Sequence, residues 1–146
     1  MKQVKKSVLL WYSPHEMYSL VIDVDHYSEF LPWCDRSEVV ERFDDGVTAR
    51  VGMAIAGVRQ SFTTRNVNVP DASVHMALVD GPFSQLDGLW RFLPLANPQA
   101  CKIEFELNYT FSSRTLEMVI SPVFDRIANS FVEGFVKRAE SVYGPR

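Results

Sequence analysis

The chain has 146 residues, of which 47% are hydrophobic and 12% aromatic, and its formal net charge at pH 7 is −3. This length and composition suit one globular domain over residues 1–146 and exclude a disordered chain. The negative charge argues weakly against a mainly electrostatic nucleic-acid binder, so we expect no DNA partner. No apolar run approaches the length that spans a membrane, and the N-terminal apolar stretch is too short for a signal peptide. We therefore expect a cytoplasmic protein.

The N-terminal part of the chain predicts one strand followed by two short helices. Residues 3–11 are rich in strand-forming residues. The sequence Ser13-Pro14-His15-Glu16 then has the pattern of a capping box with proline at the first helical position. Apolar residues continue this helix to Val24, and a second short helix is expected at residues 25–30, before Pro32.

The middle of the chain changes to a period of two, which indicates strands. Turn residues such as Asp44-Asp45-Gly46 and Pro70-Asp71 separate these runs. The predicted strands cover residues 38–43, 47–55, 58–69, 74–78, 86–93 and 100–111. In the last of them apolar residues alternate with polar ones, so the sheet should be covered on one face and solvated on the other.

The cover of this sheet is expected to be a long helix over residues 118–143. Phe124, Ile127, Phe131 and Phe135 follow a three-and-four spacing that places them on one face. Ser121-Pro122 is interpreted as the N-cap and first-turn proline, and Gly144 ends the helix. The predicted class is α+β, with a curved antiparallel sheet of about seven strands wrapped around this helix. Curling of the sheet would leave an apolar space beneath it.

Several segments, in order along nearly the whole chain, resemble the coenzyme Q-binding START-like family, which includes polyketide cyclases and the ribosome association toxin RatA. They are YSEFLPWC at residues 27–34, GVRQSFTTR at 57–65 and GPFSQLDGLWRF at 81–92, with FVKRA at 135–139 before Tyr143-Gly144. The resemblance implies a helix-grip fold and a cavity for a hydrophobic ligand, with ubiquinone as the named one. It implies no agreed catalytic residues, and residues 66–73 offer no family motif.

Two loops are candidates for the mouth of such a cavity. Phe30, Leu31, Pro32 and Trp33 would form a stiff apolar lip, and the loop from Gly81 would add Phe83 and Leu86. The alternatives are a packed corner and an ordinary hairpin turn. The lining is expected to come from Phe62, Met76, Leu78, Trp90, Phe92, Ile103, Phe105, Phe124, Ile127 and Phe131. Composition alone does not separate a lined cavity from a solid core.

Residues for catalysis or metal binding are sparse in the sequence. The three histidines, His15, His26 and His75, lack metal-ligand spacing with Cys34, and Cys34 and Cys101 read as two unrelated buried thiols. Asp23, Asp25 and His26 could form an acid–base group, but polar residues at helix starts are more often solvated caps. The basic residues Arg50, Arg59, Arg65 and Lys102 fall on polar strand faces, which are either a patch for ribosomal RNA or simply solvated.

Three functions remain open from the sequence. The first is a binding protein that holds ubiquinone or a related polyisoprenoid lipid, needs no other cofactor and supports respiratory electron transport. The second is a RatA-like toxin that binds the large ribosomal subunit and blocks subunit association. The third is a polyketide cyclase or dehydratase, which the nearly all-apolar inward face disfavours. A transient peripheral contact with the inner face of the cytoplasmic membrane accompanies the first.

Overall fold

The computed structural model describes residues 1–146 and begins with an edge strand and a set of short helices. Strand β1 (Lys2–Leu10) leads into α1 (Pro14–Val21). The capping box is confirmed, because the Glu16 amide donates to Ser13 Oγ at 3.1 Å and the Ser13 amide donates to Glu16 Oε1 at 2.9 Å. The helix ends earlier than predicted, since Asp23 leaves the helical region (φ −85°, ψ 63°). A 3₁₀ turn, η1 (Val24–His26), and the four-residue helix α2 (Tyr27–Phe30) follow.

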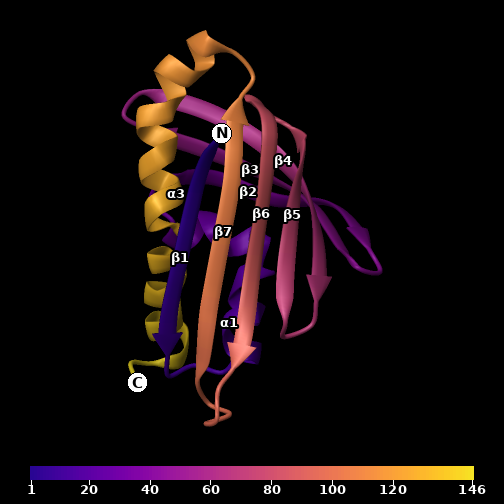
Figure 1. Ribbon diagram of the computed structural model, residues 1–146, viewed down its shortest axis with the longest axis vertical. Coiled ribbons are helices and arrows are strands. Elements are labelled where there is room, and N and C mark those ends of the chain that lie inside the picture. The colour runs from indigo at the N-terminus through magenta and orange to yellow at the C-terminus, as the bar shows by residue number, and fades with distance from the viewer.

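Six further strands complete one antiparallel sheet. They are β2 (Cys34–Phe43), β3 (Gly46–Ile55), β4 (Val58–Val69), β5 (Ser73–Asp80), β6 (Phe83–Pro94) and β7 (Cys101–Phe111). The strand order is β1-β7-β6-β5-β4-β3-β2, so β1 and β2 are the two edges. The sheet curls strongly, and Figure 1 shows it wrapped beside the long terminal helix. This confirms the predicted class, although β2 begins four residues before the predicted strand at 38–43.

The terminal helix α3 (Arg114–Tyr143) is longer than predicted. Ser113 is its N-cap and accepts a hydrogen bond from the Leu116 amide at 3.1 Å, so the start assigned to Ser121-Pro122 is wrong. The first turns project beyond the end of the sheet and lie at an angle to the rest, as expected on the N-terminal side of an internal proline (Figure 1). Met118 is 73% exposed there, so the apolar period that marks a covered helix begins only later.

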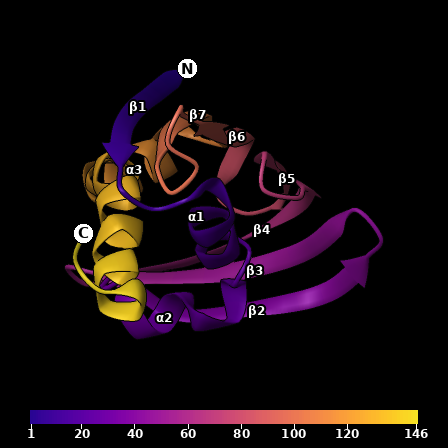
Figure 2. The same ribbon diagram turned by 90° about the horizontal axis from the view of Figure 1, so that it is seen from below.

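The core lies between the concave face of the sheet and α3. Every second residue of β7 from Cys101 to Phe111 is buried, which confirms the predicted alternation. Figure 2 shows α1 inside the curve of the sheet and α2 between α3 and β2. Leu31, just after α2, lies so close to α3 that a Cβ on Gly134 would come within 2.5 Å of Leu31 Cδ2. The glycine therefore lets the corner after α2 pack directly against the helix, and this corner forms one end of the pocket described next.

Candidate functional site: an apolar pocket with one polar edge

A pocket opens between the concave face of the sheet and α3. Its volume is about 60 Å³. Sixteen residues line it, and all but Thr64 and Asn66 are hydrophobic. The lining residues are Val24, Tyr27, Trp33, Ala49, Val51, Phe62, Thr64, Asn66, Met76, Leu86, Phe105, Leu107, Phe124, Ile127, Ala128 and Phe131. Sites for drug-sized ligands measure roughly 300–1,000 Å³, so the pocket as it stands accepts a small group or one end of a longer molecule.

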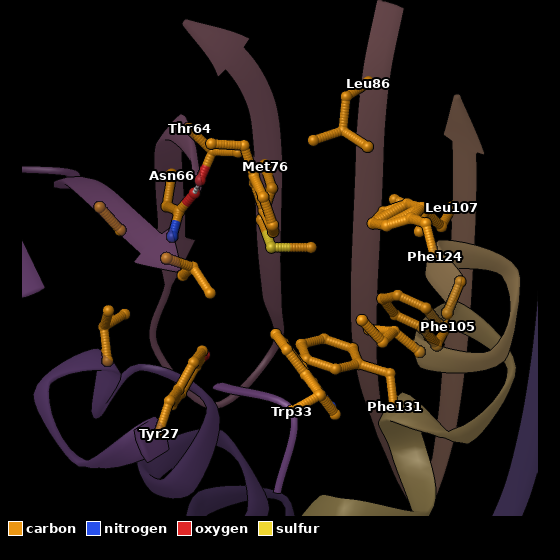
Figure 3. Close-up of a pocket in the computed structure, with 16 residues that line it drawn as sticks. Tyr27, Trp33, Thr64, Asn66, Met76, Leu86, Phe105, Leu107, Phe124 and Phe131 are labelled. Atoms are coloured by element: carbon orange, nitrogen blue, oxygen red, sulfur yellow. Dashed lines mark hydrogen bonds between the residues drawn. The ribbon is translucent and has the colours of Figure 1, made fainter. Parts of the chain in front are cut away.

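The two polar lining residues are neighbours on β4. Because strand residues alternate between faces, Phe62, Thr64 and Asn66 all point to the concave side. Thr64 Oγ1 donates a hydrogen bond to Asn66 Oδ1 at 2.7 Å, and both residues are buried. Figure 3 shows the Asn66 nitrogen turned toward the open space between Tyr27 and Met76. The pocket therefore has apolar walls and a single polar edge.

No side chain that titrates near neutral pH lines the pocket. The lining contains no Asp, Glu, His, Lys, Arg or Cys. Tyr27 donates its hydroxyl proton to the Val21 carbonyl, and burial raises its pKa far above the ordinary value. General acid–base catalysis needs a group that can exchange a proton at the operating pH. The arrangement is thus suited to binding a neutral apolar group.

The structure brings half of the sixteen residues predicted from the sequence to this pocket. Those that reach it are Trp33, Phe62, Met76, Leu86, Phe105, Phe124, Ile127 and Phe131. Those that lie outside its lining are Phe30, Leu31, Pro32, Leu78, Phe83, Trp90, Phe92 and Ile103. Sequence reasoning missed Val24, Tyr27, Ala49, Val51, Thr64, Asn66, Leu107 and Ala128. The alternation of side chains along β4 was the signal that could have placed Thr64 and Asn66 on the pocket side. Both faces of that strand carry apolar and polar residues, however, so the alternation did not show which face is buried.

The residues outside the lining have identifiable packing roles. Phe30 packs edge-on against Tyr27 and Phe135, so most of the expected lip is a packed corner from which only Trp33 reaches the pocket. Phe83 stacks on Phe111 with ring centroids 5.2 Å apart. Trp90, Phe92 and Ile103 are fully buried in the hydrophobic core, whereas Leu78 is half-buried.

A polar network that the sequence did not reveal ties β1, β7 and α3 together at one end of the molecule. Lys2 Nζ lies 2.6 Å from Asp125 Oδ2, and the Tyr109 hydroxyl donates to Asp125 Oδ1 at 2.6 Å. Ser121 Oγ donates to Asp125 Oδ2 at 3.1 Å, and Lys2 also donates to Ser121 Oγ. Burial alone would raise the pKa of Asp125, but the hydrogen bonds from Lys2 and Tyr109 hold it below its ordinary value.

The histidines do not form a shared site. His15, His26 and His75 each lie 2.7 Å from a different aspartate, namely Asp71, Asp23 and Asp87. No group of three or more His, Cys, Asp or Glu side chains is placed to hold a metal ion. Of the suggested acid–base group, Asp25 accepts a hydrogen bond from the Val39 amide at 3.0 Å and so connects η1 to β2. Asp23, Asp25 and His26 therefore have the geometry of solvated residues that connect neighbouring elements.

The basic residues singled out on strand faces are all paired with carboxylates. Arg50 lies 3.2 Å from Glu38 and Arg59 lies 2.9 Å from Asp35. Arg65 pairs with Asp45 and also lies over the Phe43 ring, and Lys102 lies 3.8 Å from Glu104. Exposed pairs of this kind contribute roughly 0–1 kcal/mol, so they exchange readily for other anions.

Comparison with known proteins identifies the class to which this fold and pocket belong. The sequence pattern of the family described as "Polyketide cyclase / dehydrase and lipid transport" matches residues 10–136. The chain belongs to that family. Its fold is shared with a START superfamily protein from Mycobacterium smegmatis (TM-score 0.80, 18% identity, 96% of this chain and 98% of the other). The Zhui aromatase/cyclase from Streptomyces sp. R1128 has the same fold (TM-score 0.82, 14% identity, 95% and 93%).

Several sequence relatives of this chain are proteins named as toxins. The ribosome association toxin RatA of Vibrio cholerae is 42% identical over 99% of both chains. The coenzyme Q-binding protein COQ10 homolog B of Xenopus laevis is 29% identical over 97% of this chain and 59% of the relative. None of the helices in the structure combines the length and apolar character that crossing a membrane requires.

Proposed function

We propose that this protein is a ribosome-association protein of the RatA type, which binds the large ribosomal subunit in the cytoplasm and blocks its joining to the small subunit. The observation that carries the proposal is the 42% identity to RatA of Vibrio cholerae over 99% of both chains. An alternative based on coenzyme Q rests on the lower identity of 29%. This order reverses the one that the sequence motifs alone favoured.

The proposed contact surface is the convex face of β3 and β4. Arg50 alternates with the buried Ala49 and Val51, and so points away from the pocket. Arg65 likewise alternates with the buried Thr64 and Asn66. Together with Arg59, these side chains can exchange their carboxylate partners for RNA phosphates, because the pairs are at the surface.

Cosedimentation with purified large subunits at several salt concentrations tests this surface. In a variant with Arg50, Arg59 and Arg65 all changed to Glu, we expect weaker binding. The slope of log affinity against log salt concentration should also be smaller in magnitude by about three. A matched control changes Lys5, Lys6 and Arg91 to Glu, which alters the net charge equally on β1 and β6. Equal loss in both variants would show that only net charge matters, and unchanged binding in the first variant would refute the surface.

The pocket supports a second proposed activity. In this activity the protein binds a small neutral molecule, and one apolar group of that molecule occupies the pocket. Ubiquinone or a related polyisoprenoid lipid is a candidate, and each buried CH₂ contributes about 0.8 kcal/mol. We do not propose a cyclase or dehydratase reaction, because the lining offers no acid–base pair. Native mass spectrometry with lipid extraction of the purified protein tests the activity. A copurifying quinone or lipid supports it, and protein that stays empty when incubated with such molecules contradicts it.

A further inference from the structure

The two edge strands of the sheet differ in how far they are covered. On the outer side of β2, Asp25 accepts a hydrogen bond from the Val39 amide at 3.0 Å. The Ser28 amide donates to Ser37 Oγ at 3.3 Å, so η1 and α2 both contact this edge. The register of β2 with β3 also shifts twice, and such irregularities interfere with pairing to a further strand. The β2 edge is therefore poorly suited to accept another strand.

Strand β1 is an uncovered edge. It pairs with β7 without a register shift, from Lys2 opposite Tyr109 to Leu10 opposite Cys101. It has no strand on its other side, and Figure 2 shows it at the rim of the molecule with β7 and α3 on its inner side. No backbone hydrogen bond outside the helices and strands involves these residues. The N–H and C=O groups of β1 that alternate away from β7 are thus available to an added strand.

Two lysines without a carboxylate partner lie on β1, one on each face. Lys2 forms an ion pair with Asp125 of α3, which places the even-numbered residues of β1 on the concave side. Lys6 therefore lies on the concave side and Lys5 on the convex side, and both are exposed. Neither forms an ion pair within the protein, although Glu106 lies opposite Lys5 on β7. Each face of the edge thus carries a free positive charge.

The other end of β1 is apolar and exposed. Leu9 is 68% exposed and lies on the same face as Lys5, and Trp11, just after the strand, is 61% exposed. Tryptophan is among the residues that contribute most to binding at protein interfaces. The edge therefore combines free backbone groups with positive charge at one end and apolar side chains at the other.

These features restrict which strand can be added. A second copy of this chain is unsuitable, because full antiparallel overlap of two β1 strands would place Lys6 opposite Lys6, and like charges directly opposite each other are destabilising. A polyanion without a peptide backbone would use the lysines but leave the edge unpaired. An extended peptide with carboxylates opposite the lysines satisfies both the charges and the backbone groups.

We propose that β1 binds an extended acidic segment of a partner protein, which joins the sheet as an additional strand. Main-chain hydrogen bonds would provide the pairing, and side chains on alternate positions would provide the selectivity. Carboxylates of the segment face Lys5 and Lys6, and its apolar residues contact Leu9 and Trp11. The inference rests on neither of the proposed activities and concerns a different surface from both.

A peptide with free-standing strand character tests the proposal. The probe is acetylated and amidated Val-Val-Thr-Thr-Glu-Glu-Thr, which in antiparallel pairing places glutamates opposite Lys6 and Lys5 and a valine opposite Leu9. It is titrated into the full-length protein and followed by amide NMR. We expect shifts in residues 2–10 and slower hydrogen exchange at alternate β1 amides, those that point away from β7. Contact through charge alone would leave that exchange unchanged.

Modified peptides separate backbone pairing from charge on the wild-type protein itself. Two copies of the probe are N-methylated, each on one of the two alternating sets of amides. One copy should lose binding, because its methyl groups face β1, and the other should bind. A peptide with lysines in place of the glutamates should bind more weakly than the probe. Equal binding of both N-methylated copies, or equal binding of the lysine peptide, would overturn the proposal.

Charge-reversed variants locate the edge that is used. Lys5→Glu with Lys6→Glu should weaken binding of the acidic probe by about 10-fold and favour the lysine peptide, because two opposite-charge pairs become like-charge pairs. The matched control is Arg36→Glu with Arg42→Glu on β2, whose side chains are 67% and 71% exposed. It changes the net charge equally and should bind the probe nearly as well as the wild type.

The remaining outcomes contradict the proposal. Equal weakening in both double variants would show that only net charge matters. Absence of probe binding to the wild type, or shifts that spare residues 2–10, would show that the edge accepts no acidic strand. Protein that dimerises through β1 in sedimentation without peptide would show that a second copy occupies the edge instead. If Lys5→Glu with Lys6→Glu does not fold, the N-methylated and lysine peptides on the wild type decide.

Discussion

Filling the pocket from α3 provides a direct test of whether it is a true void. Ala128 lines the pocket and is 1% exposed, and leucine preserves helix propensity. A cavity costs about 24 cal/mol per Å³, so a volume of about 60 Å³ corresponds to about 1.4 kcal/mol. We therefore expect Ala128→Leu to leave the free energy of unfolding unchanged or to raise it by up to about 1.4 kcal/mol. That is a rise of at most about 6 °C in Tm for a chain of this size.

Ala139 provides the matched control, because it is also a buried alanine on α3 but does not line the pocket. Ala139→Leu should overpack the core and cost about 1–3 kcal/mol. Both variants are compared with the wild type by urea and thermal unfolding, with and without ethylbenzene. Ethylbenzene should stabilise the wild type and Ala139→Leu, and should no longer stabilise Ala128→Leu. Equal destabilisation of the two variants would refute the reasoning and indicate a solid core at both positions.

Three further outcomes are expected. Ile127→Trp should keep a Tm near that of the wild type and lose extracted lipid, measured on one preparation, because Ile127 also lines the pocket. Asp125→Asn should reduce stability to urea at pH 7 and less at pH 3. The reason is that the pKa of Asp125 is lowered in the folded protein. Such a group stabilises the protein at pH values above its pKa in the unfolded chain, and this stability is lost as the pH falls through its pKa in the folded protein. His26 should titrate by NMR above its ordinary pKa, because it is hydrogen-bonded to Asp23 and lies near further acidic charge. Its contribution to stability is present at low pH and is lost as pH rises through that raised pKa, and Asp23→Asn should remove most of the shift.

Features set by local patterns were predicted most accurately from the sequence. The capping box depends only on residues 13–16, and the alternation of β7 depends only on which of its faces is covered. The start of α3 was misplaced because proline at a first helical position and proline within a helix look alike in sequence. The turns before Pro122 extend past the sheet, so they lack the apolar period that marks a buried helix.

The pocket itself was less predictable, because a lining residue and a core residue obey the same pattern. Phe105 and Ile103 lie on the same face of β7 and are both buried, yet only Phe105 borders the open space. The difference depends on where the curl of the sheet separates it from α3, which no single strand encodes. Thr64 and Asn66 were overlooked because polar residues on a mixed strand suggest a solvated face, whereas tertiary packing buries them.

Strand β4 links the two proposed activities while keeping their residues apart. Its alternation places Thr64 and Asn66 on the concave side and Arg65 on the convex side. The backbone of a central strand is held by hydrogen bonds to β3 and β5, so a side chain can change on one face with little movement of the other. The family can therefore vary its pocket and its outer surface independently. This independence is consistent with one chain being similar both to a relative named for ribosome association and to one named for coenzyme Q.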